Sequence, residues 1–371
     1  MTINEATVTI ATNDVQFDVI NHIGLVTLNR PKAHNALTHQ MVLMLTERMA
    51  AWKLDPRIRG VVLRGAGGKA FCAGGDIRAL YQSYQEKTAL YREFFVDEYR
   101  LDYMIHRYPK PCVAIMDGLV MGGGMGLAQG ATLRLVSTRS QIAMPETAIG
   151  LFPDVGASHF LSRMPIELAL YLGISGITIQ AADAIFFGLA DCYISENCIS
   201  ELESRLESIT WKHDPETKLR NALCSEHTAD PGHPPTRAFM PAVLGHFNPA
   251  FSVQQMASSL TSETEPAYKA WANKTAETLQ TRSPLMMCVA REQLLRGRGA
   301  GLANCFRMEL GLVHRTFDQG DAIEGIRALI VDKDRTPVWH ATTLSSVRDD
   351  MVDALFDSPW DASIHPLAAL V

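Results

Sequence analysis

The chain of 371 residues is 47% hydrophobic and 20% charged, and its 34 lysines and arginines against 40 aspartates and glutamates give a formal net charge of −6. Disordered proteins combine low hydrophobicity with a large charge imbalance, so this composition excludes that class. Single hydrophobic cores stop growing at about 250–300 residues, which predicts one large domain with an extension, or two domains. Mild acidity argues against nucleic acid as the main partner, because phosphate backbones are bound by clustered lysine and arginine.

Membrane and targeting signals are also lacking in the sequence. No stretch of about 18 uncharged apolar residues appears, so no membrane span is expected. Residues 1–19 contain aspartate and glutamate but neither lysine nor arginine, unlike a secretory signal or a transit peptide. The seven cysteines are scattered without a Cys-x-x-Cys pair, which favours reduced thiols, no metal site and a cytoplasmic location.

Strands alternate with helices in the N-terminal half. Residues 15–20 and 23–28 predict a hairpin-like pair of strands across Asn21 and His22. Apolar residues that recur every three or four positions predict a helix over residues 38–52. Short apolar runs predict further strands at 60–65, 111–116, 132–137 and 141–145. The short connections between these elements indicate an α/β layered fold.

The C-terminal part has a different character. Prolines crowd residues 212–250, which predicts a poorly regular connection. Beyond it the pattern predicts helices over residues 251–279, 284–295, 303–316, 321–331 and 347–355.

Two glycine-rich turns, at residues 70–77 and 121–126, each follow a predicted strand. Glycine permits positive φ angles and close backbone approach, so N–H groups from two such turns can converge on one oxygen, as in an oxyanion hole. Neither turn matches a nucleotide-phosphate signature. Gly68-Lys69 is followed by Ala70 where the P-loop needs serine or threonine, and Leu127 stands where the dinucleotide pattern that begins Gly122-x-Gly124 needs glycine. Tight turns that only allow close helix packing are the alternative.

Two acids, Glu146 and Asp154, lie in the otherwise apolar segment 144–156. Gly150 and Pro153 stand between them, so a folded loop and not one regular helix would bring them together. Partial burial raises the pKa of a carboxyl group, which suits acid–base chemistry. A capping or turn role is the alternative, above all for Asp154.

Taken together, residues 29–37, 71–77, 122–126 and 144–156 resemble the enoyl-CoA hydratase/isomerase (crotonase) superfamily, and residues 321–339 resemble its C-terminal helix and tail. The resemblance implies an α/β fold made of a spiral of repeated ββα units. The catalytic core would span residues 1–210, and a helical region, 211–371, would cover the active site. An acyl-CoA thioester would be the substrate, with no cofactor beyond that CoA, and the family implies a homo-oligomer, a trimer or hexamer or a lower state.

The resemblance also assigns roles by position. The two backbone N–H groups that hold the thioester oxygen fall on Gly75 and Gly123, and Glu98 falls in the substrate pocket, with a solvated helix face as its alternative. Further substrate-binding residues implied by the resemblance are Lys32, Ala33, Asn35, Ala73, Gly74, Asp76, Ile77 and Gly122.

The acids select a branch of the family. Hydratases that resemble this chain carry glutamate at the positions of Gly126 and Glu146, whereas Asp154 stands where they usually have glycine. This pattern resembles the branch that hydrolyses short branched 3-hydroxyacyl-CoA thioesters, such as 3-hydroxyisobutyryl-CoA in valine degradation. Glu146 would then be nucleophile or general base, and Asp154 would orient water or substrate or take the other proton-transfer role. A hydratase or isomerase for another acyl-CoA, and a non-catalytic binding protein, are the alternatives.

Overall fold

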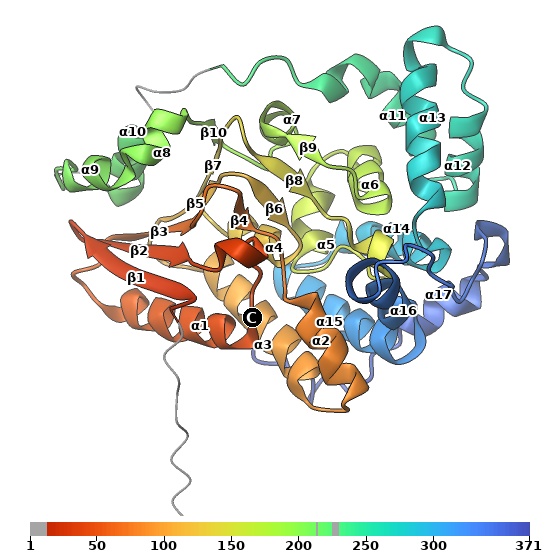
Figure 1. The fold of residues 1–371 in the computed structure, drawn as a ribbon, viewed down its shortest axis with the longest axis horizontal. Coiled ribbons are helices and arrows are strands. Elements are labelled where there is room, and N and C mark those ends of the chain that lie inside the picture. The colour runs from red at the N-terminus through yellow and green to blue at the C-terminus, as the bar shows by residue number, and fades with distance from the viewer. Residues whose placement is uncertain (1–12, 213, 225–229) are drawn as a thin grey trace, which may run out of the picture.

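The computed structural model describes residues 13–212, 214–224 and 230–371 (Figure 1). The expectation that residues 1–19 carry no targeting signal falls mostly outside these ranges. None of the helices in these ranges has the length and apolar character that a membrane crossing needs.

The larger sheet has six strands within the described residues, in the order β1-β2-β3-β5-β7-β10. Their bounds are β1 (Val15–Ile20), β2 (Ile23–Leu28), β3 (Gly60–Gly65), β5 (Cys112–Met116), β7 (Leu133–Val136) and β10 (Cys192–Tyr193). Strands β1 and β2 pair antiparallel, and the other neighbours pair parallel. Asn21 and His22, both with positive φ, form the two-residue turn between β1 and β2, a geometry that matches the natural twist of a hairpin.

The smaller sheet brings the site segments together. It consists of β4 (Ala70–Cys72), β6 (Leu119–Met121), β8 (Gln141–Ala143) and β9 (Ile179–Gln180), with β4, β6 and β8 parallel and β9 antiparallel to β8. The two glycine turns follow β4 and β6, and Glu146 follows β8. Because parallel strands end at the same edge of a sheet, these three segments meet there.

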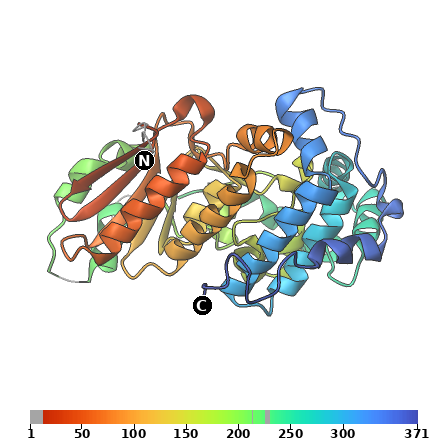
Figure 2. The ribbon, with the colours of Figure 1, turned by 90° about the horizontal axis from the view of Figure 1, so that it is seen from below.

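Helices α1 and α3 pack side by side beneath the larger sheet (Figures 1 and 2). Thr38 caps α1 by accepting a hydrogen bond from the Met41 N–H, as the predicted start of this helix requires. The helices and helical turns of residues 13–212 are η1 (Pro31–Ala33), α1 (His39–Leu54), α2 (Ile77–Gln85), α3 (Leu90–His106), α4 (Gly123–Gln129), η2 (Glu146–Ile149), α5 (Ala157–Phe160), η3 (Leu161–Arg163), α6 (Ile166–Ser175), α7 (Ala181–Phe186), α8 (Glu196–Ser200) and α9 (Leu202–Glu207).

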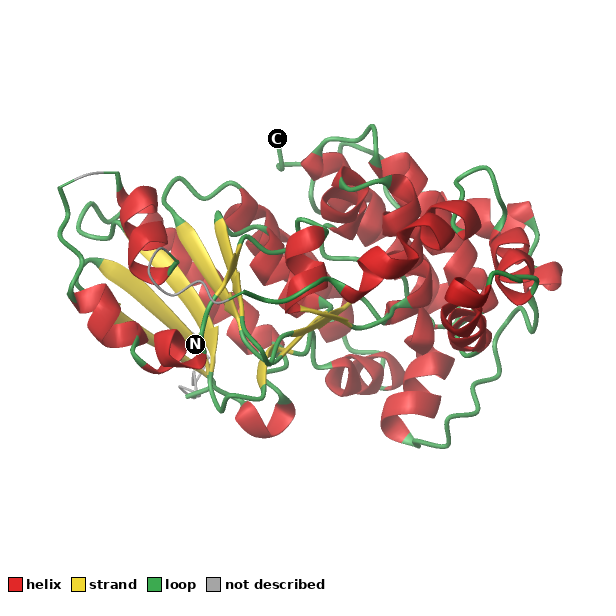
Figure 3. Cartoon of the chain, turned by 90° about the horizontal axis from the view of Figure 1, so that it is seen from above, coloured by secondary structure: helices red, strands yellow, loops and turns green. Residues whose placement is uncertain are grey.

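The second half of the chain is helical. Its helices and helical turns are α10 (Pro215–Leu223), η4 (Pro235–Phe239), α11 (Met240–His246), α12 (Val253–Thr261), α13 (Pro266–Gln280), α14 (Pro284–Gly297), α15 (Leu302–Gln319), α16 (Ala322–Ile326), the π-helical turn η5 (Arg327–Val331), η6 (Leu344–Ser346) and α17 (Asp349–Phe356). From α11 onward this half gathers at the end of the molecule away from the larger sheet (Figures 1 and 3). Helix α10 packs instead against the larger sheet, where Leu219 and Leu223 are buried with Ile23 and Val62.

The predicted α/β class with a helical C-terminal region is confirmed, with two corrections. A single helix over 251–279 is wrong, because the chain breaks between α12 and α13, and Pro266 occupies the first turn of α13, where its missing N–H costs nothing. Residues 212–250 are more regular than predicted, since α10, η4 and α11 all lie there.

The C-terminal helices and the sheet region share one hydrophobic core. Phe306 of α15 is fully buried, and its ring packs against the rings of Tyr99, Tyr103 and His106 on α3. Helix α3 therefore has a sheet-side helix, α1, along one flank and a C-terminal helix along another. The position of every side chain on α3 depends on both halves of the chain.

Removal of the Phe306 ring tests this shared core. We expect Phe306→Ala to lower the free energy of unfolding by about 3–5 kcal/mol, because a large buried ring leaves a cavity. Urea unfolding followed by both tryptophan fluorescence and circular dichroism should show one transition at lower urea, whereas the control Val338→Ala, at a side chain that is 76% exposed, should leave the midpoint unchanged. Two separate transitions in the wild-type protein would contradict a shared core.

Candidate active site

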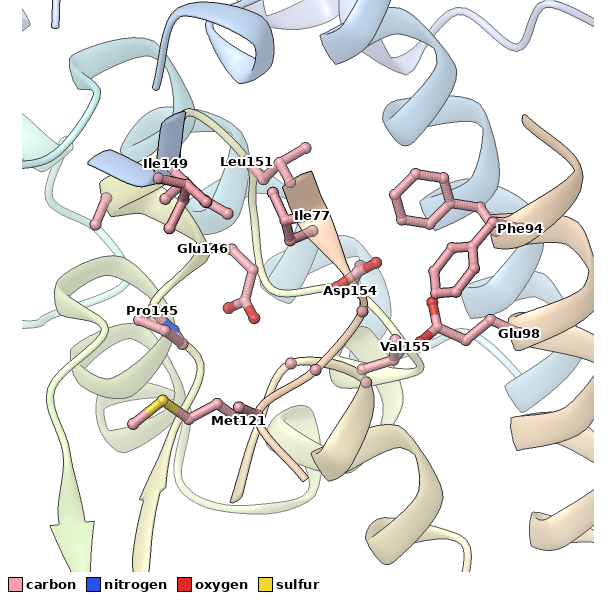
Figure 4. A pocket seen from close by; sticks show the side chains of 18 of the residues that line it. Ile77, Phe94, Glu98, Met121, Pro145, Glu146, Ile149, Leu151, Asp154 and Val155 are labelled. Atoms are coloured by element: carbon pink, nitrogen blue, oxygen red, sulfur yellow. The ribbon is translucent and has the colours of Figure 1, made fainter. Parts of the chain in front are cut away.

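A cavity of about 330 Å³ opens where the three segments meet (Figure 4). Its wall combines both glycine turns with three acids, Glu98 of α3, Glu146 of η2 and Asp154. Leu329 and Ile330 of η5 complete the wall from the C-terminal half. Most of the remaining lining is apolar, so the acids face an environment that is poor in water.

The first glycine turn lies directly against the second. Gly74 has φ of +97°, and a Cβ built on it would lie 3.2 Å from the Met121 carbonyl oxygen and 3.4 Å from the Gly123 nitrogen. A Cβ on Gly75 would lie 3.0 Å from the Phe94 ring. A side chain at Gly74 would therefore push the two turns apart, and a side chain at Gly75 would press against the Phe94 ring, which explains glycine at these positions.

The second turn lies against two of the acids. A Cβ on Gly123 would lie 2.2 Å from Glu98 Oε1, and one on Gly122 would lie 3.2 Å from Glu146 Oε1. Within the described residues, the N–H groups of Gly75 and Gly123 donate no hydrogen bond to the protein. Two N–H donors on adjoining turns, beside carboxyl groups, form the arrangement that an oxyanion hole requires.

Glu146 opens η2 and is only 6% exposed. Its carbonyl oxygen accepts hydrogen bonds from the N–H groups of Gly150 and Leu151, which close the turn and fix the backbone. Side-chain atom Oε2 has no hydrogen-bond partner within the described ranges. Burial, and secondly the charge of Asp154, raise the pKa of Glu146 well above the ordinary 4.5.

Asp154 is half-buried and projects into the same cavity as Glu146 (Figure 4). The Tyr99 hydroxyl donates a 2.7 Å hydrogen bond to Asp154 Oδ2. Burial raises the pKa of Asp154 to about 6, and the Tyr99 hydrogen bond opposes that rise. Sequence reasoning did not assign a role to Tyr99, although it stands next to Glu98 on α3.

Glu98 is 2% exposed, so it is not a solvated helix-face acid. Burial, and then the Asp154 charge, raise the pKa of Glu98 well above its ordinary value. One helical turn further, Asp102 is fully buried, and neither of its carboxylate oxygens has a described partner. A Cβ on Gly126 would lie 2.5 Å from Asp102 Oδ2, so glycine at position 126 leaves the room that Asp102 occupies.

The cavity wall includes all the site residues predicted from the sequence except Lys32, Ala33, Asn35 and Asp76. Lys32 is exposed and Ala33 half-buried on η1, outside the cavity. Their contact with substrate remains a prediction.

Asn35 and Asp76 have structural partners of their own. The fully buried Asn35 amide accepts from the Arg30 N–H and donates to the carbonyl oxygens of Ala66 and Ala70. The Asp76 carboxylate caps α2 and pairs with Arg30 at 3.1 Å. Both side chains therefore shape the first glycine turn from outside the cavity, and a direct substrate contact by either remains a prediction.

No group of three or more His, Cys, Asp or Glu residues is arranged to hold a metal ion in the part of the chain that the structure describes.

Comparison with known proteins agrees with this geometry. The family model for enoyl-CoA hydratase/isomerase matches residues 23–356. The chain therefore belongs to the enoyl-CoA hydratase/isomerase family. Its predicted crotonase-like fold class is confirmed.

The curated relatives include enzymes of one specificity. A mitochondrial 3-hydroxyisobutyryl-CoA hydrolase of Xenopus tropicalis is 36% identical over 335 residues, which cover 90% of this chain and 86% of the relative. A probable 3-hydroxyisobutyryl-CoA hydrolase of Arabidopsis thaliana is 34% identical over 340 residues, which cover 90% of this chain and 89% of the relative.

Solved structures support the fold over almost the whole chain. A carnitinyl-CoA dehydratase from Mycobacterium thermoresistibile matches with a TM-score of 0.85 at 37% identity, covering 94% of this chain and 98% of that one. An enoyl-CoA hydratase from Rhodobacter sphaeroides 2.4.1 matches with a TM-score of 0.84 at 34% identity, covering 93% and 98%. These two proteins are named for dehydration and hydration, whereas the relatives from Xenopus and Arabidopsis are named for hydrolysis.

Substitution of Gly123 tests the second turn. We expect Gly123→Ala to lower the turnover number at least about tenfold, because the added methyl group displaces the Glu98 carboxyl and shifts the N–H beside it. Circular dichroism should stay near wild type. The matched control Gly245→Ala, where a Cβ meets nothing within 4 Å, should keep full activity. Unchanged turnover in Gly123→Ala would show that the N–H at this position holds no reacting oxygen.

Proposed function

We propose that the protein hydrolyses a short branched 3-hydroxyacyl-CoA thioester, namely 3-hydroxyisobutyryl-CoA, to 3-hydroxyisobutyrate and CoA, a step of valine degradation. The observation that carries the proposal is the pair Glu146 and Asp154, which face one cavity beside two free N–H donors. The curated relatives named 3-hydroxyisobutyryl-CoA hydrolase support the choice of substrate. We propose no cofactor beyond the CoA of the substrate.

The two glycine turns bind and polarise the thioester. The N–H groups of Gly75 and Gly123 donate to the carbonyl oxygen, where negative charge develops as the acyl carbon becomes tetrahedral. The glycines also let the acyl carbon lie close to the backbone. Glu98, at the apolar end of the cavity beside Phe94, binds the 3-hydroxyl group of the substrate (Figure 4).

Glu146 and Asp154 catalyse the cleavage of the thioester bond. Water supplies an oxygen to the acyl carbon, the carbon–sulfur bond breaks, and one water proton ends on the CoA sulfur. Glu146 either attacks the acyl carbon and forms a mixed anhydride, or removes a proton from the attacking water. Asp154, fixed by Tyr99, orients the water or passes a proton to the leaving sulfur.

Hydration or dehydration of an acyl-CoA is the second candidate function, because two relatives of known structure are named for these reactions. In the hydratases that this chain resembles, a second glutamate stands at the position of Gly126. Here a side chain at that position would meet Asp102 at 2.5 Å and the Val155 Cβ at 2.8 Å. The space for a second glutamate is therefore occupied, which favours hydrolysis.

Location and assembly are also proposals. We propose a cytoplasmic location, which the scattered, unpaired cysteines favour. Several relatives are named mitochondrial, so fractionation of the source cells decides between the two locations. The family favours a homo-oligomer, which analytical ultracentrifugation measures directly.

The substrate test is the release of free thiol from a panel of short 3-hydroxyacyl-CoA and enoyl-CoA esters. We expect the wild-type protein to release thiol fastest from 3-hydroxyisobutyryl-CoA, and Glu146→Gln to lose about two to four powers of ten in turnover with little change in binding of the ester. The control Glu207→Gln, on an exposed helix face, should behave as wild type. Consumption of an enoyl-CoA without thiol release would point to hydration instead.

Labelled water separates the two roles of Glu146. After a single turnover in oxygen-18 water, label in the Glu146 carboxyl identifies the mixed-anhydride route. Label that appears only in the product acid shows that water attacked the acyl carbon of the substrate and opposes opening of an anhydride at the Glu146 carbonyl. Mass spectrometry of the peptide that contains Glu146 reads the first outcome.

The pH dependence follows from the coupling of the two acids. A base or nucleophile must lose its proton, so kcat/KM should rise with pH as Glu146 ionises, and this rise should lie well above the ordinary 4.5 because burial and the charge of Asp154 raise the pKa of Glu146. In Asp154→Asn the negative neighbour is gone, the pKa of Glu146 falls, and the rise of the remaining activity should move to lower pH. An unmoved profile would show that the two acids do not interact.

A further inference from the structure

The loop that carries Asp154 contains an unusual backbone conformation. Val155, the next residue, has φ of +55°, in the left-handed region that β-branched residues avoid. Gly156 follows with φ of +88°. Such strain persists only where the surrounding structure fixes it, typically at functional sites.

Glu309 of α15 holds the loop after Asp154. Its Oε2 accepts a 2.6 Å hydrogen bond from the Gly156 N–H, and its Oε1 accepts a 2.8 Å hydrogen bond from the Ser158 N–H. Glu309 is fully buried and has no ion-pair partner within the described residues. Burial raises the pKa of Glu309 to about 8, which the hydrogen bonds from the loop oppose. A buried acid is costly unless it is hydrogen-bonded, so this contact is specific.

Gln293 of α14 holds the same loop from the other side of Asp154. Its Nε2 donates to the Pro153 carbonyl oxygen and, at 2.8 Å, to Ser158 Oγ. Gln293 is itself fully buried and approaches Glu309 Oε1 at 3.4 Å. Two polar side chains from two C-terminal helices thus hold the backbone on both flanks of Asp154.

We propose that Glu309 and Gln293 are positioning residues, which force the strained turn at Val155 and so hold the Asp154 carboxyl toward Glu146 and the glycine turns. Tyr99 fixes the side chain of Asp154, whereas Glu309 and Gln293 fix its backbone. The long C-terminal half then has a function in catalysis beyond its contribution of Leu329 and Ile330 to the cavity wall. The inference rests on the proposed hydrolysis for its effect on rate, and on geometry alone for its effect on the loop.

Glu309→Gln is the principal variant. The glutamine oxygen can still accept a hydrogen bond from one of the two N–H groups, of Gly156 or Ser158, but the amide NH₂ group cannot accept from the other. Gln293→Met is the second variant, because it removes the donors while keeping the length of the side chain. The control is Val313→Ala, one turn from Glu309 on α15 and also buried, which destabilises the protein through a cavity and removes no hydrogen bond to the loop.

The expected result has two parts. In both variants the turnover number falls about tenfold to a hundredfold while KM changes less than about threefold, because Asp154 is displaced but the thioester site is intact. Hydrogen exchange, read by mass spectrometry, becomes faster in peptides that cover residues 153–158 in both variants. Val313→Ala, at a similar loss of melting temperature, keeps the wild-type turnover number and wild-type exchange in this loop.

Three outcomes would overturn the inference. They are an unchanged turnover number in both variants of an active enzyme, an equal loss of turnover in Val313→Ala, and exchange at residues 153–158 that no variant alters. Failure of the proposed function gives a different pattern, in which the wild-type protein releases no thiol from any ester. In that case the exchange measurement alone decides whether Glu309 and Gln293 hold the loop.

Discussion

The burial of carboxyl groups without basic partners is the constraint on which the rest of the site depends. Five acids share one region of the interior, and none has an ion-pair partner within the described residues: Glu98, Asp102, Glu146, Asp154 and Glu309. Unpaired charge is costly in an apolar interior, so burial raises the pKa of all five groups, and the charge of a neighbouring acid raises it further for Glu98, Asp102, Glu146 and Glu309. Carboxyl groups whose pKa is raised in this way are candidates for the proton transfers of acid–base catalysis.

The fold supports these acids with neutral donors. The Tyr99 hydroxyl donates a hydrogen bond to Asp154, and two backbone N–H groups donate hydrogen bonds to Glu309. The glycine turns leave two further N–H groups free beside the cavity. The parallel strands of the smaller sheet bring the glycine turns and Glu146 to one edge, and α3, clamped between α1 and α15, adds Glu98 and Tyr99. Neutral donors hold an anionic substrate group without cancelling the acidity of the site, which fits a chain whose net charge is −6.

Local motifs were readable from the sequence, and long-range partners were not. The glycine turns, Glu146 and Asp154 lie in short segments, so their chemistry could be predicted. Glu309 comes from a helix 155 positions beyond Asp154 in the sequence, and no short motif joins the two. One signal was available: α3 and α15 are amphipathic, and Glu98 and Glu309 fall at the three- and four-residue spacing of their buried faces. An acid on the apolar face of a helix is the signal that singles out Glu98 and Glu309. The break within 251–279 also had a local signal, Pro266 at the start of α13, which apolar periodicity alone does not take into account.

The protonation state of Glu146 is the most direct measure of the burial of carboxyl groups without basic partners. Nuclear magnetic resonance of protein labelled with carbon-13 at the glutamate side-chain carboxyl gives its titration, and comparison with Glu146→Gln assigns the signal. A midpoint well above the ordinary 4.5 is the expected result, since burial and Asp154 both oppose ionisation. A midpoint at or below 4.5 would contradict it, because Glu146 would then have a cationic partner or water that the site does not provide.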